Sequence, residues 1–318
     1  MKIGSYILYK CIVFRKTLHL VGKKVHFGIV IMQTIVIFAV ANVAFERSRC
    51  TFLTPIDAKL FTNIINFFYT MGCFLTNSSV GKKVVMSVSG CFLVLFILFH
   101  MAMNLTMLFS PEGYDMVCEF LGANWYALVG TVILAVGVLV HFVYAFILTI
   151  DNYRARGKQR YAVTVQEKGV SWASKNMLVL GIIVILGLGL HLVHFWSEMQ
   201  LQEILGKTTT TVGGYEVHAT SGAAIMMITF SKWYNVVLYL VWFAALWFHL
   251  THGVWSMFQS VGAANDTWYP RLKLTSNVIA TLVFLGFAAV VIFCYIQANE
   301  TTIAELGATQ IEDVKVFE

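Results

Sequence analysis

Histidines in apolar segments are the residues of this chain whose type and spacing could do chemistry. Six of the nine histidines lie in long apolar stretches, where an ionisable side chain is costly and usually marks function. These are His100, His141, His191, His194, His249 and His252. A single histidine in a membrane helix is often only hydrogen-bonded to its neighbour. Four successive stretches that each carry a histidine at or past the midpoint indicate instead imidazoles that meet and bind a metal ion.

Five charge-free segments must position these side chains. The chain has 318 residues, of which 58% are hydrophobic and 12% are charged, whereas about a quarter are charged in a typical soluble domain. No Lys, Arg, Asp or Glu occurs in residues 84–109, 120–150, 176–197, 233–265 and 274–299. Each segment exceeds the roughly 20 residues that cross a bilayer core as a helix, and only a helix satisfies its own backbone there. The sequence therefore predicts an all-α integral membrane protein, a bundle of five transmembrane helices.

The distribution of charge gives the orientation and excludes nucleic acid as a partner. The net charge is +6, but the basic residues lie beside the apolar segments. The loop at 151–175 is strongly basic, whereas the loop at 110–119 carries only acidic charges. By the positive-inside rule, Lys83, the loop from Arg154 to Lys175 and Arg271 face the cytoplasm.

The depth of each histidine then predicts which imidazoles meet. Successive helices run in opposite directions, so His100 shares the outer half of the membrane with His191 or His194. His141 shares the inner half with His249 or His252. An offset of about four residues from each midpoint separates the two levels by roughly 12 Å at 1.5 Å per residue.

Haem iron fits such pairs better than other metals do. Zinc is usually held by four ligands, often Cys or carboxylate, and neither lies at these depths. A haem iron needs two axial ligands, for which neutral imidazole serves. The six cysteines form no C-x-x-C pair, which excludes a thioredoxin-like motif, a cysteine-rich metal site and covalent haem attachment. We therefore expect two haems b, with small residues such as Gly130, Gly137 and Gly187 making room for them. Two haems at two levels form an electron path, with a quinone as the lipid-soluble partner and a redox protein on the cytoplasmic side.

Four short motifs carry a resemblance to a known family. They are F-H-M-A-M-N around His100, L-V-H-F-V-Y around His141, L-G-I-I-V-I-L-G-L-G-L-H ending at His191, and F-H-L-T-H-G-V-W-S around His249. From about residue 81 to residue 296, the chain resembles the five-helix, two-haem cytochrome b anchor of bacterial succinate:quinone oxidoreductases. These complexes are the succinate dehydrogenases and fumarate reductases.

The resemblance implies a site and a set of partners. It makes His100, His141, His191 and His249 the haem ligands, paired as His100 with His191 and His141 with His249, so that His194 and His252 become packing residues. It also places Ser87 and the basic region of Arg154 to Arg160 and Lys175 near haem propionates. The implied partners are a flavoprotein and an iron–sulfur subunit, the implied substrate is a quinone, with menaquinone expected, and the implied location is the bacterial cytoplasmic membrane.

One acidic residue is a candidate for quinone protons. In such anchors a carboxylate near the outer haem often handles them, and Glu119 is the candidate here, with an ordinary loop carboxylate as the alternative. Leu246, Trp247 and Phe248 precede His249, so no carboxylate is available at that position of the fourth helix.

Two alternatives stay open. Another quinone-linked di-haem cytochrome b, such as the membrane subunit of a hydrogenase or formate dehydrogenase, would share the histidine pattern. A transporter or channel with histidines along a polar path would be expected to carry intramembrane Asp or Glu, which the five segments lack.

The start of the chain also has two interpretations. Residues 1–75 are either an extension with an extra apolar helix at 27–45 or an upstream start that is not part of the functional protein. Residues 76–300 form the five-helix domain, and 301–318 are a polar tail.

Overall fold

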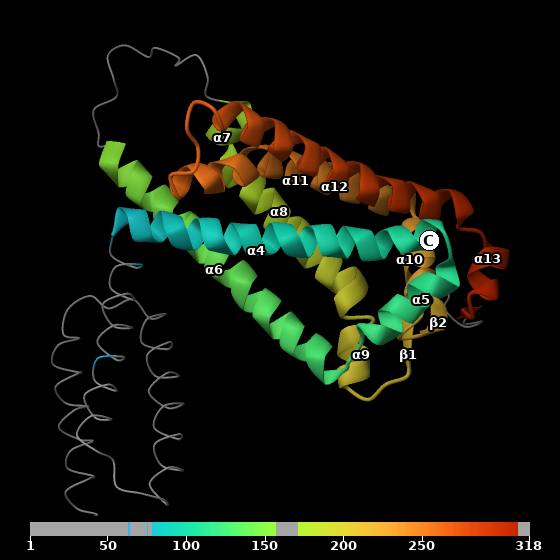
Figure 1. Ribbon diagram of the computed structural model, residues 1–318. Coiled ribbons are helices and arrows are strands. Elements are labelled where there is room, and N and C mark those ends of the chain that lie inside the picture. Colours follow the sequence, from blue (N-terminus) through green and yellow to red (C-terminus); the bar gives the residue numbers. More distant parts are fainter. Residues whose placement is uncertain (1–62, 64–74, 76–77, 157–170, 311–318) are drawn as a thin grey trace, which may run out of the picture. The chain divides into compact units, whose positions relative to one another are not determined.

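A computed structural model describes residues 63, 75, 78–156 and 171–310, and Figure 1 shows them as ribbons. Apart from residues 63 and 75, the extension predicted at 1–75 lies outside the described residues, as do residues 157–170 of the basic loop and 311–318 of the tail. The helices and strands of the fold belong to a compact unit that begins at Ser79.

Five helices of this unit are long and apolar enough to cross a membrane, which confirms the predicted number of spans. In chain order they are α4 (Ser79–Leu105, extended by a 3₁₀ turn, Thr106–Leu108), α6 (Trp125–Arg156), α8 (Met177–His191, extended by a π-helical turn, Leu192–Trp196), α11 (Trp233–Ser260) and α12 (Tyr269–Gln297). The chain is therefore a multi-pass, all-α membrane bundle with small additional elements outside the spans.

Local signals set the boundary between the last two spans. α11 ends where Gly262 adopts a φ of +81°, and the Ala263 N–H donates back to the Phe258 carbonyl at 2.9 Å. This is the Schellman ending that glycine favours because it has no Cβ. The Asn265 side chain then accepts hydrogen bonds from the next backbone N–H groups, and Pro270 stands in the first turn of α12, where proline costs no hydrogen bond.

The spans pack mainly through α4 and α11. α4 packs against α6, α11 and α12, and α11 also packs against α8 and α12. Ser276 of α12 is fully buried, and its hydroxyl donates to the Leu250 and Thr251 carbonyls of α11 at 2.9 Å. Small and hydroxyl side chains at such contacts let two membrane helices approach closely.

The two ends of the bundle differ in character. At the end where α4 begins and α6 and α11 finish, Lys82 donates to Asp151 at 2.6 Å and links α4 to α6. We call this the basic end. The opposite end is covered by short elements, as Figure 1 shows on the right of the view. We call it the capped end. The covering elements are α5 (Pro111–Phe120), α9 (Gln200–Ile204), β1 (Thr209–Val212), β2 (Tyr215–His218), α10 (Gly222–Phe230), α13 (Glu300–Glu305) and β3 (Thr309–Gln310).

The cap has a core of its own. Every residue of α10 is buried, although at nine residues the helix is too short to cross a bilayer. β1 and β2 form an antiparallel hairpin with Val212 opposite Tyr215. Gly213 and Gly214 form its turn with φ of +58° and +89°, as a two-residue hairpin turn requires. β3 adds a third strand beside β2, so the segment after the last span belongs to the cap.

The remaining short helix lies at the basic end. α7 (Trp172–Lys175) precedes α8 directly. The Ser171 hydroxyl accepts a hydrogen bond from the Ser174 N–H and so caps its first turn.

Candidate functional site

The structure brings together His100 of α4 and His191 of α8 toward the capped end. Their ring centroids are 5.8 Å apart and their planes are nearly perpendicular at 80°. Phe96 stacks on His100 at 5.5 Å, and Trp242 lies 5.9 Å from His191. The pair is therefore enclosed by aromatic rings, with Phe287 of α12 on a further side of His100.

His141 of α6 and His249 of α11 form a second pair toward the basic end. Their ring centroids are 6.4 Å apart at an interplanar angle of 63°. The Ser89 hydroxyl lies 3.2 Å from His141 Nδ1 and 3.1 Å from the Met86 carbonyl. When the hydroxyl donates to that carbonyl, it accepts from His141 Nδ1–H. The proton of the neutral ring is then on Nδ1, and Nε2 is unprotonated, as binding to a metal ion requires.

Both separations suit two imidazoles that share one metal ion. A metal–nitrogen bond of about 2 Å on each side, together with the radii of the two rings, gives a centroid separation of about 6 Å. Among the described residues, no three His, Cys, Asp or Glu side chains come together in a group that could hold a metal ion. The arrangement therefore fits an ion that takes two protein ligands and receives its other ligands from elsewhere, as haem iron does.

A glycine lies beside each histidine of the basic-end pair. A Cβ on Gly90 of α4 would be 3.3 Å from the His141 ring, and a Cβ on Gly181 of α8 would be 3.7 Å from the His249 ring. Each glycine precedes the capped-end histidine of its own helix by ten residues, because Gly90 is followed by His100 and Gly181 by His191. Ten residues correspond to about 15 Å along a helix, close to the separation of levels that the sequence predicts.

The three glycines expected to make room for haem, Gly130, Gly137 and Gly187, do not border the paired imidazoles. A Cβ on Gly187 would collide with the Trp242 ring, and one on Gly137 would meet Phe92 at 2.7 Å. Nothing lies within 4 Å of such an atom on Gly130. The glycines that border the imidazoles are Gly90 and Gly181, and the repeated ten-residue Gly-to-His spacing is the signal that could have identified them.

The two doublets differ in how the second histidine is placed. His194 Nδ1 lies 3.2 Å from the Tyr239 hydroxyl, and the two rings stack at 15°. His252 contacts Trp255 edge-on at 5.0 Å, and its Nδ1 is buried without a hydrogen-bond partner among the described residues, as is that of His249. Because His249 also reaches His141, it remains the expected ligand of its doublet.

The residues predicted near propionates are spread over the basic end. The Ser87 hydroxyl donates to the Lys83 carbonyl of its own helix at 2.9 Å. Arg154 and Lys175 are exposed, and neither forms an ion pair with another described residue.

A cavity of about 520 Å³ opens between α4, α6 and α11 at the basic end. Its polar lining comes from residues other than the predicted ones: Lys83, Ser256, Gln259 and Ser260.

At the capped end, Asp115 rather than Glu119 lies within the packed cap. Glu119 is exposed. Asp115 accepts a hydrogen bond from the Ala223 N–H at 2.8 Å, at the start of α10, and burial raises the pKa of its carboxyl.

A polar chain runs from His100 through Asn104 to Tyr114, with contacts of 3.4 Å at both steps. Burial holds the pKa of Tyr114 well above its ordinary value, so its hydroxyl stays neutral and can donate.

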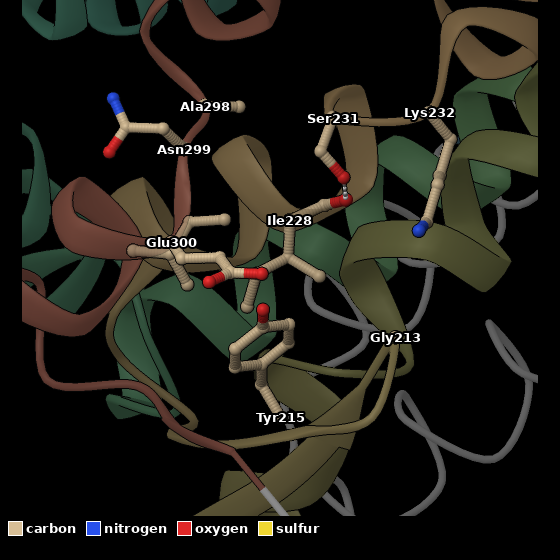
Figure 2. Close-up of a pocket in the computed structure, with 9 residues that line it drawn as sticks. Gly213, Tyr215, Ile228, Ser231, Lys232, Ala298, Asn299 and Glu300 are labelled. Carbon is tan, nitrogen blue, oxygen red and sulfur yellow. Dashed lines mark hydrogen bonds between the residues drawn. The ribbon is translucent and has the colours of Figure 1, made fainter. Parts of the chain in front are cut away.

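A second pocket, of about 220 Å³, lies within the cap (Figure 2). Tyr215 of β2 and Glu300 of α13 point into it, and Lys232 stands at its far side in Figure 2. Both charged side chains are exposed. The pocket is thus a surface hollow whose lining includes none of the four paired histidines.

In comparisons with known proteins, no family model, no curated protein and no solved structure matches this chain. What the fold defines is a class: a multi-pass membrane protein with five candidate spans among the residues that the structure describes. The histidines add two imidazole pairs at two levels of that bundle.

Proposed function

We propose that this chain is a di-haem cytochrome b that anchors a succinate:quinone oxidoreductase, a succinate dehydrogenase or fumarate reductase, in the bacterial cytoplasmic membrane. In this proposal it carries electrons between an iron–sulfur subunit and a quinone. The single observation that carries the proposal is the meeting of four histidines from four spans as two pairs, 5.8 Å and 6.4 Å apart.

The pairs are unusual for a packed membrane protein. Polar side chains inside a bilayer normally satisfy each other by hydrogen bonds. Neither imidazole pair is so joined, and His249 Nδ1 is buried without a partner among the described residues. A metal ion between the rings would account for two pairs of imidazoles whose centroids lie 5.8 Å and 6.4 Å apart without a hydrogen bond between them.

The chain's own residues would hold and tune the group. His100 and His191 would bind one iron, and His141 and His249 the other. Bound haem supplies one-electron redox chemistry, which no side chain of the site provides. Ser89 would hold His141 in the tautomer with its proton on Nδ1, a role that matters for metal affinity. Lys83 lines the basic-end cavity and is the cation expected to face propionates there.

The more specific identity rests on the four histidine motifs and their order along the chain. The succinate or fumarate chemistry would take place on a separate flavoprotein, since no segment resembles a flavin or dicarboxylate site. Besides Glu119, we propose Asp115 as a second candidate for the carboxylate that exchanges quinone protons, because it is half-buried in the cap and directly follows Tyr114, the last residue of the polar chain that leads to His100.

The test is purification of the membrane complex with identification of its subunits and haem quantitation. We expect two non-covalent haems b per chain and co-purification of a flavoprotein and an iron–sulfur protein. His141→Ala and His249→Ala should each remove one haem, whereas His252→Ala should leave both.

A colourless wild-type complex would refute the electron-carrier proposal. Two haems with a hydrogenase or formate dehydrogenase as the co-purifying enzyme would keep the di-haem site and replace the succinate assignment.

A further inference from the structure

His194 is a polar side chain that the proposed haem site does not use. It lies in the π-helical turn Leu192–Trp196, at the capped end of the third span. The Ser197 N–H bonds to the Leu192 carbonyl at 2.8 Å, five residues back. Such wide turns are rare and occur frequently at functional sites. At this turn His191 and His194 extend in different directions around the helix axis. His191 therefore meets His100, while His194 meets Tyr239.

Tyr239 holds the His194 ring in one orientation. Its side chain is 2% exposed and is fixed edge-on against Phe230 at 5.0 Å and Trp242 at 5.6 Å. Its hydroxyl lies 3.2 Å from His194 Nδ1. When this hydroxyl donates to Nδ1, the neutral imidazole carries its proton on Nε2.

The Nε2–H group is then a donor that points away from its only described partner. Tyr239 is the one described residue that hydrogen-bonds to the His194 ring, and His194 is half-buried. The turn belongs to a candidate span, and its Leu192 and Val193 are 42% and 62% exposed, so part of the turn is apolar and open to the membrane. A half-buried donor within a candidate span can be satisfied by an acceptor that a lipid-soluble molecule brings.

Phe195 connects this donor to the candidate electron carrier. Its ring lies 5.2 Å from His191 and 6.4 Å from His194. A ligand bound at His194 is therefore adjacent to the capped-end imidazole pair.

We propose that His194 Nε2 donates a hydrogen bond to a carbonyl oxygen of a quinone headgroup that enters from the membrane, and that Tyr239 is the positioning residue for this bond. The inference rests on the proposed function, because it assigns the quinone contact of the same site. A quinone has the required properties: it is lipid-soluble, it carries two carbonyl acceptors, and its flat ring suits the neighbouring aromatic side chains.

The experiment uses the purified full-length complex in phosphatidylglycerol–phosphatidylethanolamine nanodiscs with 2,3-dimethyl-1,4-naphthoquinone labelled with ¹³C at its carbonyls. We expect the bound carbonyl stretch to lie below that of free quinone in infrared difference spectra. His194→Phe should abolish that shift and raise Kd about five- to tenfold, the value of one hydrogen bond. His194→Gln keeps an N–H donor and should retain part of the carbonyl band shift and part of the quinone affinity.

Two further variants complete the test. Tyr239→Phe keeps the ring packing and removes the hydroxyl. It should broaden the shifted carbonyl band of the quinone and weaken quinone binding by a smaller factor than His194→Phe does. His252→Phe changes the matching histidine of the other doublet, three residues beyond His249, and should leave both readouts unchanged.

Haem absorbance in the same samples separates the two proposals. A wild-type complex without haem refutes the proposed function. A haem-replete complex that binds no quinone, or whose carbonyl band is the same in wild type and His194→Phe, overturns the inference. If His194→Phe fails to fold, an unchanged band and Kd in Tyr239→Phe overturn it.

Discussion

Ser89→Ala should weaken the binding of the haem proposed at the basic-end pair without altering the fold. The Ser89 hydroxyl lies 3.2 Å from His141 Nδ1, at the long end of the range for an N–H···O hydrogen bond. A neutral hydrogen bond of this kind contributes about 1 kcal/mol, and a buried donor left without a partner costs about 1–3 kcal/mol. We therefore expect a loss of about 1–2 kcal/mol, which is about a five- to thirtyfold weaker haem affinity.

The assay is the transfer of haem from the purified protein to an excess of apo-globin, followed by absorbance. Ser87→Ala is the matched control, because both serines are on α4 and both are 7% exposed. The Ser87 hydroxyl donates to the Lys83 carbonyl of its own helix. Its removal should leave both haems retained as in the wild type.

Two results would contradict this reasoning. Equal haem retention in Ser89→Ala and wild type would show that the hydroxyl does not support His141. A loss in Ser87→Ala equal to that in Ser89→Ala would favour the propionate contact that the family resemblance assigns to Ser87 over the geometry described here.

Two further predictions concern the cap. Burial raises the pKa of Asp115, so the folded protein binds this proton more tightly than the unfolded chain does, and stability should fall as pH rises from about 4 through the raised pKa. Asp115→Asn keeps an acceptor for the Ala223 N–H and should flatten that slope in thermal unfolding; an unchanged slope would contradict the assignment. Burial also raises the pKa of the Cys118 thiol to about 12, so N-ethylmaleimide should modify Cys118 at about pH 8 only after denaturation. Rapid labelling of the native protein, detected by mass spectrometry, would show that this thiol is accessible.

The five spans could be predicted from the sequence because the absence of charge over more than twenty residues has one structural solution in a bilayer. The pairing of the histidines followed from direction and depth alone. The choice of His249 within its doublet did not, because His249 and His252 lie on adjacent parts of one face. The ring contact with His141 distinguishes them.

The cap could not be predicted from charge patterns. α10 is an apolar run of nine residues, shorter than any span, so the length that identifies a membrane helix does not identify it. The adjacent glycines at 213 and 214, between two short runs rich in Thr, Val and Tyr, are the local pattern in this segment that indicates a hairpin. The burial of Asp115 depends on α5 meeting α10 across 108 residues of chain, and no local pattern indicates such a contact.

The third strand of the cap has a consequence for biogenesis. Gln310 pairs with Tyr215 and Thr309 with Glu216, so a strand made after the fifth span completes a sheet begun between the third and fourth. Ribosomes deliver these strands far apart in time, and two more spans must be inserted between them. The sheet can therefore close only once membrane insertion is complete, and a chain cut short before Thr309 would have all five helices in the bilayer and an open edge on β2.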